Sequence, residues 1–173
     1  MRQLLLLRHA KSSWDDPSLP DFERPLNPRG QAAAAAMRGA MFGLGLQPDQ
    51  VLVSTSRRTM ETLHALEPWE ETPLVDPMDS LYLAPAAGLL RTVQDLQPTV
   101  RSVMVIAHNP GLHDLALLLT GQAAAAGELG RLREGFPSGA LVELLVTVPW
   151  AELAEGSARL VRFLSPRDLP QVA

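Results

Sequence analysis

Residues 4–11 of the chain read Leu-Leu-Leu-Leu-Arg-His-Ala-Lys, and this stretch decides how the rest is interpreted. Four consecutive leucines predict a short strand buried on both faces, as in a parallel sheet covered by helices. The strand ends abruptly at Arg8 and His9. Ligands bind at the carboxyl ends of the strands in open α/β folds. Arg8 and His9 are therefore candidate site residues, although an edge arginine and a capping histidine would explain them if they stood alone.

Other apolar runs outside this stretch predict further strands, at residues 51–53, 100–107, 141–148 and 158–164. Helical patterns lie between them, at residues 29–44, 57–66, 86–96 and 112–119. Asn27 and Pro28 suit the start of the first helix and Gly45 its end. The alternation of strands and helices predicts an α/β fold with a largely parallel sheet covered on both faces, in a single domain over residues 1–173. The proline-rich segment 12–28 and the segment 121–139 are expected to be irregular.

The composition limits the possible functions. A formal net charge of -4 argues against broad binding of nucleic acid, so a bound anion requires a local cluster of cations. The absence of cysteine excludes thiol nucleophiles and zinc–thiolate sites. The leucine run is too short for a signal peptide, and no apolar stretch reaches 18 residues. We expect a cytoplasmic, monomeric protein with neither a nucleic-acid nor a membrane partner.

Two more predicted strands end in basic or hydrogen-bonding residues. The strand at 51–53 leads through Ser54 to Arg57 and Arg58 at the start of a helix, whose N-terminus favours anions. Neighbours on a helix point in different directions, so we expect Arg58 to face the site and Arg57 to face solvent. The strand ending at residue 107 leads to His108, followed by Asn-Pro-Gly. Three strand ends thus converge on one edge of the sheet.

These motifs together resemble the histidine phosphatase (phosphoglycerate mutase-like) superfamily. Arg8-His9 matches its first signature, and His108-Asn-Pro-Gly its second histidine motif. Residues 54–62 are similar to its Ser-Pro-x-x-Arg-x-x-x-Thr segment, with Thr55 in place of proline and Arg58 in the arginine position. The length and the run Arg24-Pro-Leu are most similar to the SixA-type phosphohistidine phosphatases. The resemblance spans residues 4–169 and implies a three-layer α/β/α sandwich around a largely parallel mixed sheet.

The resemblance implies a phosphatase that acts in signal transduction on a phosphohistidine of a protein. His9 would attack phosphorus through one ring nitrogen while the other donates to a backbone carbonyl, and water would hydrolyse the intermediate. Arg8 and Arg58 would grip the phosphoryl oxygens, and His108 would add a donor. Cations near His9 are expected to disfavour its protonation. These groups need no magnesium, so no metal or cofactor is expected.

Further roles at this site are less sharply defined by the sequence. Larger members of the superfamily use a carboxylic acid to protonate the leaving group, and Asp79 is the candidate here, though a polar loop residue explains it equally well. Lys11 and Arg24 are further candidates for binding substrate, and His113 lies close to the second motif.

Two other functions remain open. One is a phosphatase of small phosphomonoesters. The other is a phosphate-binding interaction module without catalysis, although binding alone would not require His9.

Overall fold

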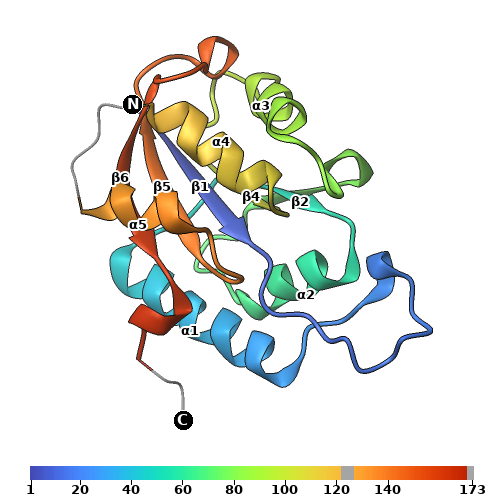
Figure 1. Cartoon of the computed structure of the whole chain (residues 1–173). Coiled ribbons are helices and arrows are strands. Elements are labelled where there is room, and N and C mark those ends of the chain that lie inside the picture. The colour runs from blue at the N-terminus through green and yellow to red at the C-terminus, as the bar shows by residue number, and fades with distance from the viewer. Residues whose placement is uncertain (122–126, 171–173) are drawn as a thin grey trace.

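The computed structural model describes residues 1–121 and 127–170, which build a six-stranded mixed sheet with helices on both faces (Figure 1). The sheet order is β3-β2-β4-β1-β5-β6. The pairs β1–β4, β2–β4 and β2–β3 are parallel, while β5 runs antiparallel to both β1 and β6. The strands are β1 (Arg2–Arg8), β2 (Gln50–Ser54), β3 (Leu74–Met78), β4 (Ser102–Ala107), β5 (Leu141–Val146) and β6 (Ala158–Leu164).

The leucines of β1 alternate between two hydrophobic cores, one on each face of the sheet. Leu4 and Leu6 pack with residues of α3, α4 and α5, whereas Leu5 and Leu7 pack with residues of α1 and α2. In Figure 1, α1 and α2 accordingly lie on the opposite side of the sheet from α3 and α4. The predicted three-layer α/β/α sandwich is therefore confirmed. The helices are α1 (Pro28–Leu44), α2 (Arg57–Ala65), α3 (Ala86–Gln94), α4 (Gly111–Thr120) and α5 (Glu128–Glu134).

Helix α1 begins and ends where the sequence predicts. The side chain of Asn27 accepts a hydrogen bond from the backbone N–H of Gly30 at 2.8 Å, and Pro28 occupies the first turn. The helix stops at Gly45, whose φ of 67° is the left-handed conformation that glycine adopts at little cost. Its first turn adjoins the end of β1, because the N–H of Asn27 donates to the carbonyl of Lys11.

Two elements differ from the expectation. Strand β3 was not predicted, because it is a largely exposed edge strand that contains Pro77, and an edge is where a sheet tolerates proline. The segment 121–139 is not irregular throughout, since it contains α5, which buries Leu129 and Leu132. Residues 122–126 of that segment lie outside the described residues. In segment 12–28, a 3₁₀ turn at Asp21–Glu23 and a bridge between Ser12 and Leu26 interrupt an otherwise irregular path.

The topology brings several chain segments to one edge of the sheet. Because β1 and β2 flank β4 and both run parallel to it, the carboxyl ends of the three strands lie together. The antiparallel β5 starts at this same edge, where Leu141 pairs with Leu7. Residues 136–140 therefore lie beside the end of β1, where the N–H of Arg8 donates to the carbonyl of Ala140. No helix in the described ranges has the length and apolar character needed to span a membrane.

Candidate active site

His9 follows β1 directly and is 7% exposed. Its ring Nδ1 lies 2.7 Å from the carbonyl oxygen of Ala10. A carbonyl only accepts, so Nδ1 carries the proton and Nε2 holds a lone pair. That Nε2 faces the Nε of Arg58 at 3.4 Å. The expected backbone contact that fixes the tautomer is present.

The pKa of His9 is lowered to about 4. Burial of the ring is the largest cause, and the hydrogen bond to Ala10 opposes it. The positive charges of Arg58, Arg8 and Arg24 lower the pKa further. The sequence predicted the effect of the cations, but desolvation exceeds it. His9 is therefore neutral at physiological pH, and its Nε2 is available as a nucleophile.

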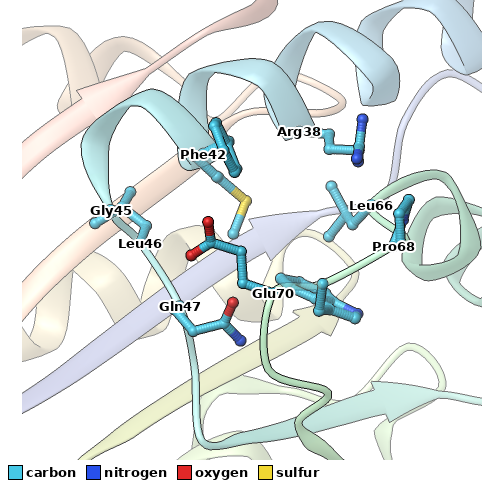
Figure 2. A pocket seen from close by; sticks show the side chains of 10 residues that line it. Arg38, Phe42, Gly45, Leu46, Gln47, Leu66, Pro68 and Glu70 are labelled. Carbon is cyan, nitrogen blue, oxygen red and sulfur yellow. The ribbon is translucent and has the colours of Figure 1, made fainter.

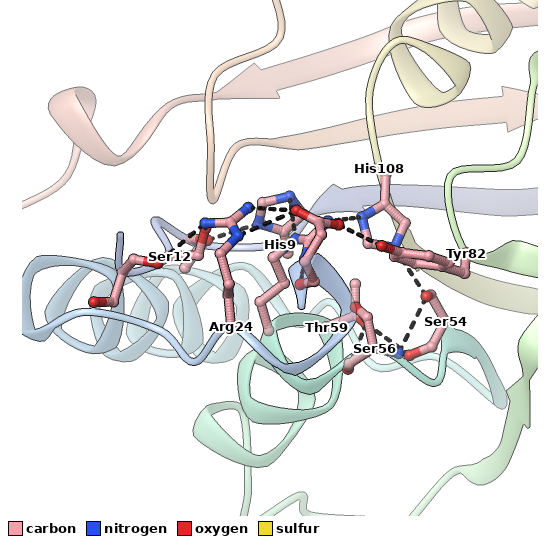
Figure 3. A network of polar contacts seen from close by, with 12 residues as sticks. His9, Ser12, Arg24, Ser54, Ser56, Thr59, Tyr82 and His108 are labelled. Carbon is pink, nitrogen blue, oxygen red and sulfur yellow. Dashed lines mark hydrogen bonds and ion pairs between the residues drawn. The ribbon is translucent and has the colours of Figure 1, made fainter. Parts of the chain in front are cut away.

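Arg58 lies at the start of α2 and is 3% exposed. Figure 3 shows the network of polar contacts at this site, with His9, Arg24 and His108 among its labelled members. Its Nη1 donates to the backbone carbonyl of Asp21 at 2.8 Å, and its Nη2 pairs with the Asp21 carboxylate at 3.0 Å. Its other contacts, from Nε to His9 and from Nη2 to Nδ1 of His108, are long at 3.4 Å each. Asp21 thus fixes the guanidinium on one side, while the opposite side faces two imidazoles.

His108 follows β4 and is 2% exposed. Its Nδ1 faces the donor Nη2 of Arg58, so Nδ1 accepts, and Nε2 carries the proton toward the hydroxyl of Ser54 at 2.9 Å. Burial lowers the pKa of His108 to about 3, and the nearby His9 and Arg58 add to this effect. Ser54 is itself held, because its carbonyl accepts the hydroxyl of Thr59 at 2.7 Å. The end of β2 therefore orients the ring that follows β4.

Arg8 is anchored to the segment before β5. Its Nη1 donates to the carbonyl of Phe136 at 3.0 Å, and the same carbonyl accepts Nδ2 of Asn109 at 2.9 Å. Burial lowers the pKa of Arg8, and the charge of Arg58 adds to this effect. The buried Nε of Arg8 has no hydrogen-bond partner among the described residues. Arg8 is thus held in place by the segment before β5, and its Nε is a buried donor without a partner among the described residues.

Asp21 is the site residue that the sequence did not reveal. Its carboxylate binds Arg58 and Arg24, and it accepts the hydroxyl of Tyr82. Burial raises the pKa of Asp21, but hydrogen bonds from Tyr82, Arg58 and Arg24 outweigh this and hold it at about 2. Asp21 is therefore ionised and joins two arginines from different segments. The only signal in the sequence is its position three residues before Arg24.

These groups surround an open pocket. The pocket gathers all the predicted site residues except Asp79, whose carboxylate accepts the hydroxyl of Thr55 at 2.5 Å outside the lining. His113 does not line it either, and its Nε2 contacts the carbonyl of Leu132 at 2.6 Å. Among the described residues, no three His, Asp or Glu side chains are grouped to hold a metal ion. The lining comprises Arg8, His9, Lys11, Ser12, Trp14, Arg24, Arg58, Leu83, His108, Asn109 and Ser138.

Arg57 differs from its neighbour as the helical spacing predicts. Its side chain is exposed, and its Nε pairs with Glu61 at 2.9 Å on the surface of α2. It does not line the pocket. The two adjacent arginines are thus separated into a buried one and a solvated one.

Comparison with known proteins gives a consistent result. The sequence profile of the histidine phosphatase superfamily (branch 1) matches residues 4–77. An uncharacterised protein of Mycobacterium tuberculosis is 32% identical over 167 residues, which cover 93% of this chain and 100% of that protein. The chain belongs to the histidine phosphatase superfamily. An uncharacterised chloroplastic protein of Arabidopsis thaliana is 36% identical over 132 residues, which cover 69% of this chain and 60% of the plant protein.

A similar solved structure indicates the branch of the superfamily to which this chain belongs. The structure from Nakamurella multipartita, assigned as phosphohistidine phosphatase SixA, has a TM-score of 0.83 and 29% identity, and the match covers 95% of this chain and 96% of that chain. The chain is therefore a SixA-type member of the superfamily and has the phosphoglycerate mutase-like fold.

Proposed function

We propose that this histidine phosphatase removes the phosphoryl group from phosphohistidine on a protein, through a covalent phosphohistidine at His9 and without a metal ion. The observation that carries the proposal is the unprotonated Nε2 of His9, which faces Arg58 in a buried, cationic pocket. Its pKa of about 4 keeps this nitrogen nucleophilic at neutral pH.

The first step transfers the phosphoryl group to His9. The lone pair of His9 Nε2 forms a new P–N bond while the P–N bond to the substrate imidazole breaks. The leaving imidazole keeps the electron pair of the broken bond and takes a proton from solvent. The hydrogen bond from Nδ1 to Ala10 stabilises the positive charge that forms on the ring of His9.

The arginines stabilise the charge on the three equatorial oxygens of the transition state. The contacts from Arg58 to His9 and His108 are both 3.4 Å, which suits replacement by shorter contacts to phosphoryl oxygens. Arg8, which also lines the pocket, adds a second guanidinium. Asp21 holds Arg58 in position and so keeps these donors preorganised.

His108 acts as a donor once the phosphoryl group is bound. In the free enzyme its Nδ1 accepts from Arg58, and its pKa is about 3. A phosphoryl dianion beside the ring favours the protonated form, because opposite charges stabilise one another at short range. Nδ1 then donates to an oxygen while Nε2 keeps its contact with Ser54.

The second step regenerates the enzyme. Water attacks phosphorus, an O–P bond forms, and the bond from phosphorus to His9 Nε2 breaks with its electron pair returning to that nitrogen. Inorganic phosphate leaves, and the proton of the attacking water passes to phosphate or solvent. Lys11 and Arg24, which line the pocket, hold the anion in both steps.

The leaving group favours phosphohistidine over an alkyl phosphate. An imidazole leaves without forming a strongly basic alkoxide, so the reaction needs little help from an acid. The proposed reaction does not need Asp79 as the acid, and the carboxylate of Asp79 accepts the hydroxyl of Thr55 and does not line the pocket. Asp21, with a pKa of about 2, is ionised and holds no proton to give. The SixA assignment of the similar Nakamurella protein supports the same substrate class.

A side-by-side turnover assay tests the proposal. The purified chain would be given a histidine-phosphorylated histone and a panel of small phosphate esters, each with and without EDTA. We expect the highest kcat/KM on the phosphohistidine protein, and no loss with EDTA. Higher kcat/KM on a small ester would favour the phosphomonoesterase alternative. Loss of activity with EDTA that magnesium restores would contradict metal independence, and binding of phosphate without turnover would indicate an interaction module.

A further inference from the structure

The catalytic pocket combines a cationic interior with an apolar rim. Arg58 and His108 lie in the interior and are almost fully buried. Two large apolar side chains that also line the pocket are exposed instead, Trp14 at 75% and Leu83 at 52%. They come from separate segments of the chain, and neither takes part in the proposed phosphoryl transfer. Exposed apolar side chains beside a ligand pocket point to a binding surface.

The indole ring of Trp14 stacks on a guanidinium that is held in place by other side chains. The guanidinium of Arg24 lies 3.6 Å from the centroid of the indole ring. Arg24 is itself held by the Asp21 carboxylate at 3.0 Å and by the hydroxyl of Ser12 at 2.7 Å. An indole stacked on a guanidinium that is fixed in this way loses little freedom when a ligand binds. The ring is thus preorganised at the edge of the pocket.

Leu83 is held in a conformation that its own side chain disfavours. Its φ is 52°, the only positive φ of a non-glycine residue in the described part of the chain. The turn around it is fixed at both ends, by the fully buried Leu81 and by Ala84. The carbonyl of Ala84 lies so close to Gly111 that a Cβ there would be 2.0 Å from the oxygen. Strain that the surroundings impose at a pocket indicates a functional constraint.

Two polar side chains of the pocket lining, Asn109 and Ser12, are engaged within the protein. Asn109 donates to the carbonyl of Phe136 and accepts from the N–H of His113. The hydroxyl of Ser12 accepts from Arg24. Where a sugar phosphate contacted Trp14 and Leu83, its hydroxyls would meet an indole and a leucine, which offer them no hydrogen bond, and this is unfavourable. A flat ring with apolar neighbours fits this surface better.

We infer that Trp14 and Leu83 determine specificity for the group that leaves, by packing against the imidazole ring of phosphohistidine and the apolar side chains next to it on the substrate protein. This inference rests on the proposed function and deepens it. The phosphoryl group enters the cationic interior, while the rim contacts the ring that carries it.

The test compares two substrates that share a P–N bond. Phosphohistidine as the free amino acid carries the imidazole ring, and phosphoramidate carries none. The measured quantity is the kcat/KM for phosphohistidine divided by that for phosphoramidate, which cancels any general loss from disturbing Arg24. We expect this ratio to fall about fivefold or more in Trp14→Ala, and by a smaller factor in Leu83→Gly. Glycine suits the φ of 52°, so Leu83→Gly is expected to fold. If Trp14→Ala fails to fold, the ratio measured for Leu83→Gly tests the inference.

Phe42→Ala serves as the matched control, since Phe42 is 69% exposed and lies outside the catalytic pocket. The control is expected to keep the wild-type ratio. A histidine-phosphorylated histone should show the same order of loss among the variants as free phosphohistidine. An unchanged ratio in both rim variants, with both substrates turned over, would overturn the inference and leave the proposed function intact. A wild-type enzyme that hydrolyses esters but not phosphohistidine would overturn both.

Discussion

Two pockets at opposite ends of α1 differ in what they bury. The first turn of α1 adjoins the catalytic segment, and its last turn, about 25 Å away, borders a second pocket (Figure 2). This second pocket is walled by Met41, Phe42, Leu46, Leu66 and Trp69, with charged groups among its other lining residues. The catalytic pocket instead buries two histidines and two arginines.

The difference separates residues that stabilise the fold from residues that serve the reaction. Burying carbon is favourable, so the pocket at the end of α1 needs no explanation beyond packing. Burying charge is unfavourable unless partners compensate for it. Asp21 compensates Arg58 and Arg24, but His9 and His108 remain uncharged with strongly lowered pKa values. A cluster of this kind is typical of an active site.

The largest expected effect is that of His9→Ala. The substitution removes the proposed nucleophile, so turnover of phosphohistidine should fall by at least about a thousandfold. Steady-state rates and a thermal melt of both proteins would measure the effect. The fold should survive, because His9 follows the end of β1 and contributes no apolar packing to either core. Turnover near the wild-type rate would exclude His9 as nucleophile.

Arg58→Lys comes next, with Arg57→Lys as its matched control. Lysine cannot reproduce the planar fork by which Arg58 binds Asp21 on one side and faces the imidazoles on the other. We expect the kcat of Arg58→Lys to fall about a hundredfold, beyond any loss of stability. Arg57→Lys keeps its charge at the surface beside Glu61 and should be nearly silent. Equal effects in the two variants would contradict the separation of the two arginines.

Met41→Ala probes the opposite pocket. Met41 is 2% exposed and packs in the core between α1 and the sheet, so its truncation should lower the free energy of unfolding by about 2–5 kcal/mol. The kcat per folded molecule should not change. Urea unfolding and steady-state kinetics below the melting transition would measure both. A large loss of kcat in a folded Met41→Ala protein would show that the two pockets are coupled.

The smallest expected effect is a loss of stability on acidification, which originates in His9 of the catalytic pocket. The pKa of His9 is about 4 in the folded chain and 6.5 ordinarily, so the unfolded chain binds more protons between these values. Stability therefore falls as the pH decreases from about 6.5 towards 4, by about 1–2 kcal/mol for this residue near pH 5. Urea unfolding at about pH 7 and pH 5 would measure the fall. It should be smaller in His9→Ala, and an equal fall in both proteins would contradict the lowered pKa.

The sequence predicts those parts of the molecule that follow from local patterns. The leucines before Arg8 predict a buried strand, and the ends of three such strands predict one shared site. Helical spacing alone separates Arg58 from Arg57. The position of Lys11 in the pocket also agrees with expectation, but its role, like the single-domain organisation, stays a prediction.

Asp21 and Tyr82 lie beyond what such patterns can reveal. Asp21 meets Arg58 because the proline-rich segment folds back over α2, and Tyr82 reaches Asp21 from the turn that follows β3. No periodicity in the sequence marks either path. Strand β3 escaped prediction for a related reason, since an exposed edge strand lacks the apolar run that identifies a buried one. Asp79 was a plausible acid in the sequence, but in the structure it binds Thr55 instead.

The most direct test of the account is to trap the phosphoenzyme. The wild-type chain would be mixed with a labelled phosphohistidine substrate, quenched in alkali within one turnover, digested and analysed by mass spectrometry. The account predicts one phosphoryl group on Nε2 of His9, stable to base and labile to acid, and none in His9→Ala. A phosphoryl group on another residue would contradict it, as would turnover at the wild-type rate with no phosphoenzyme formed.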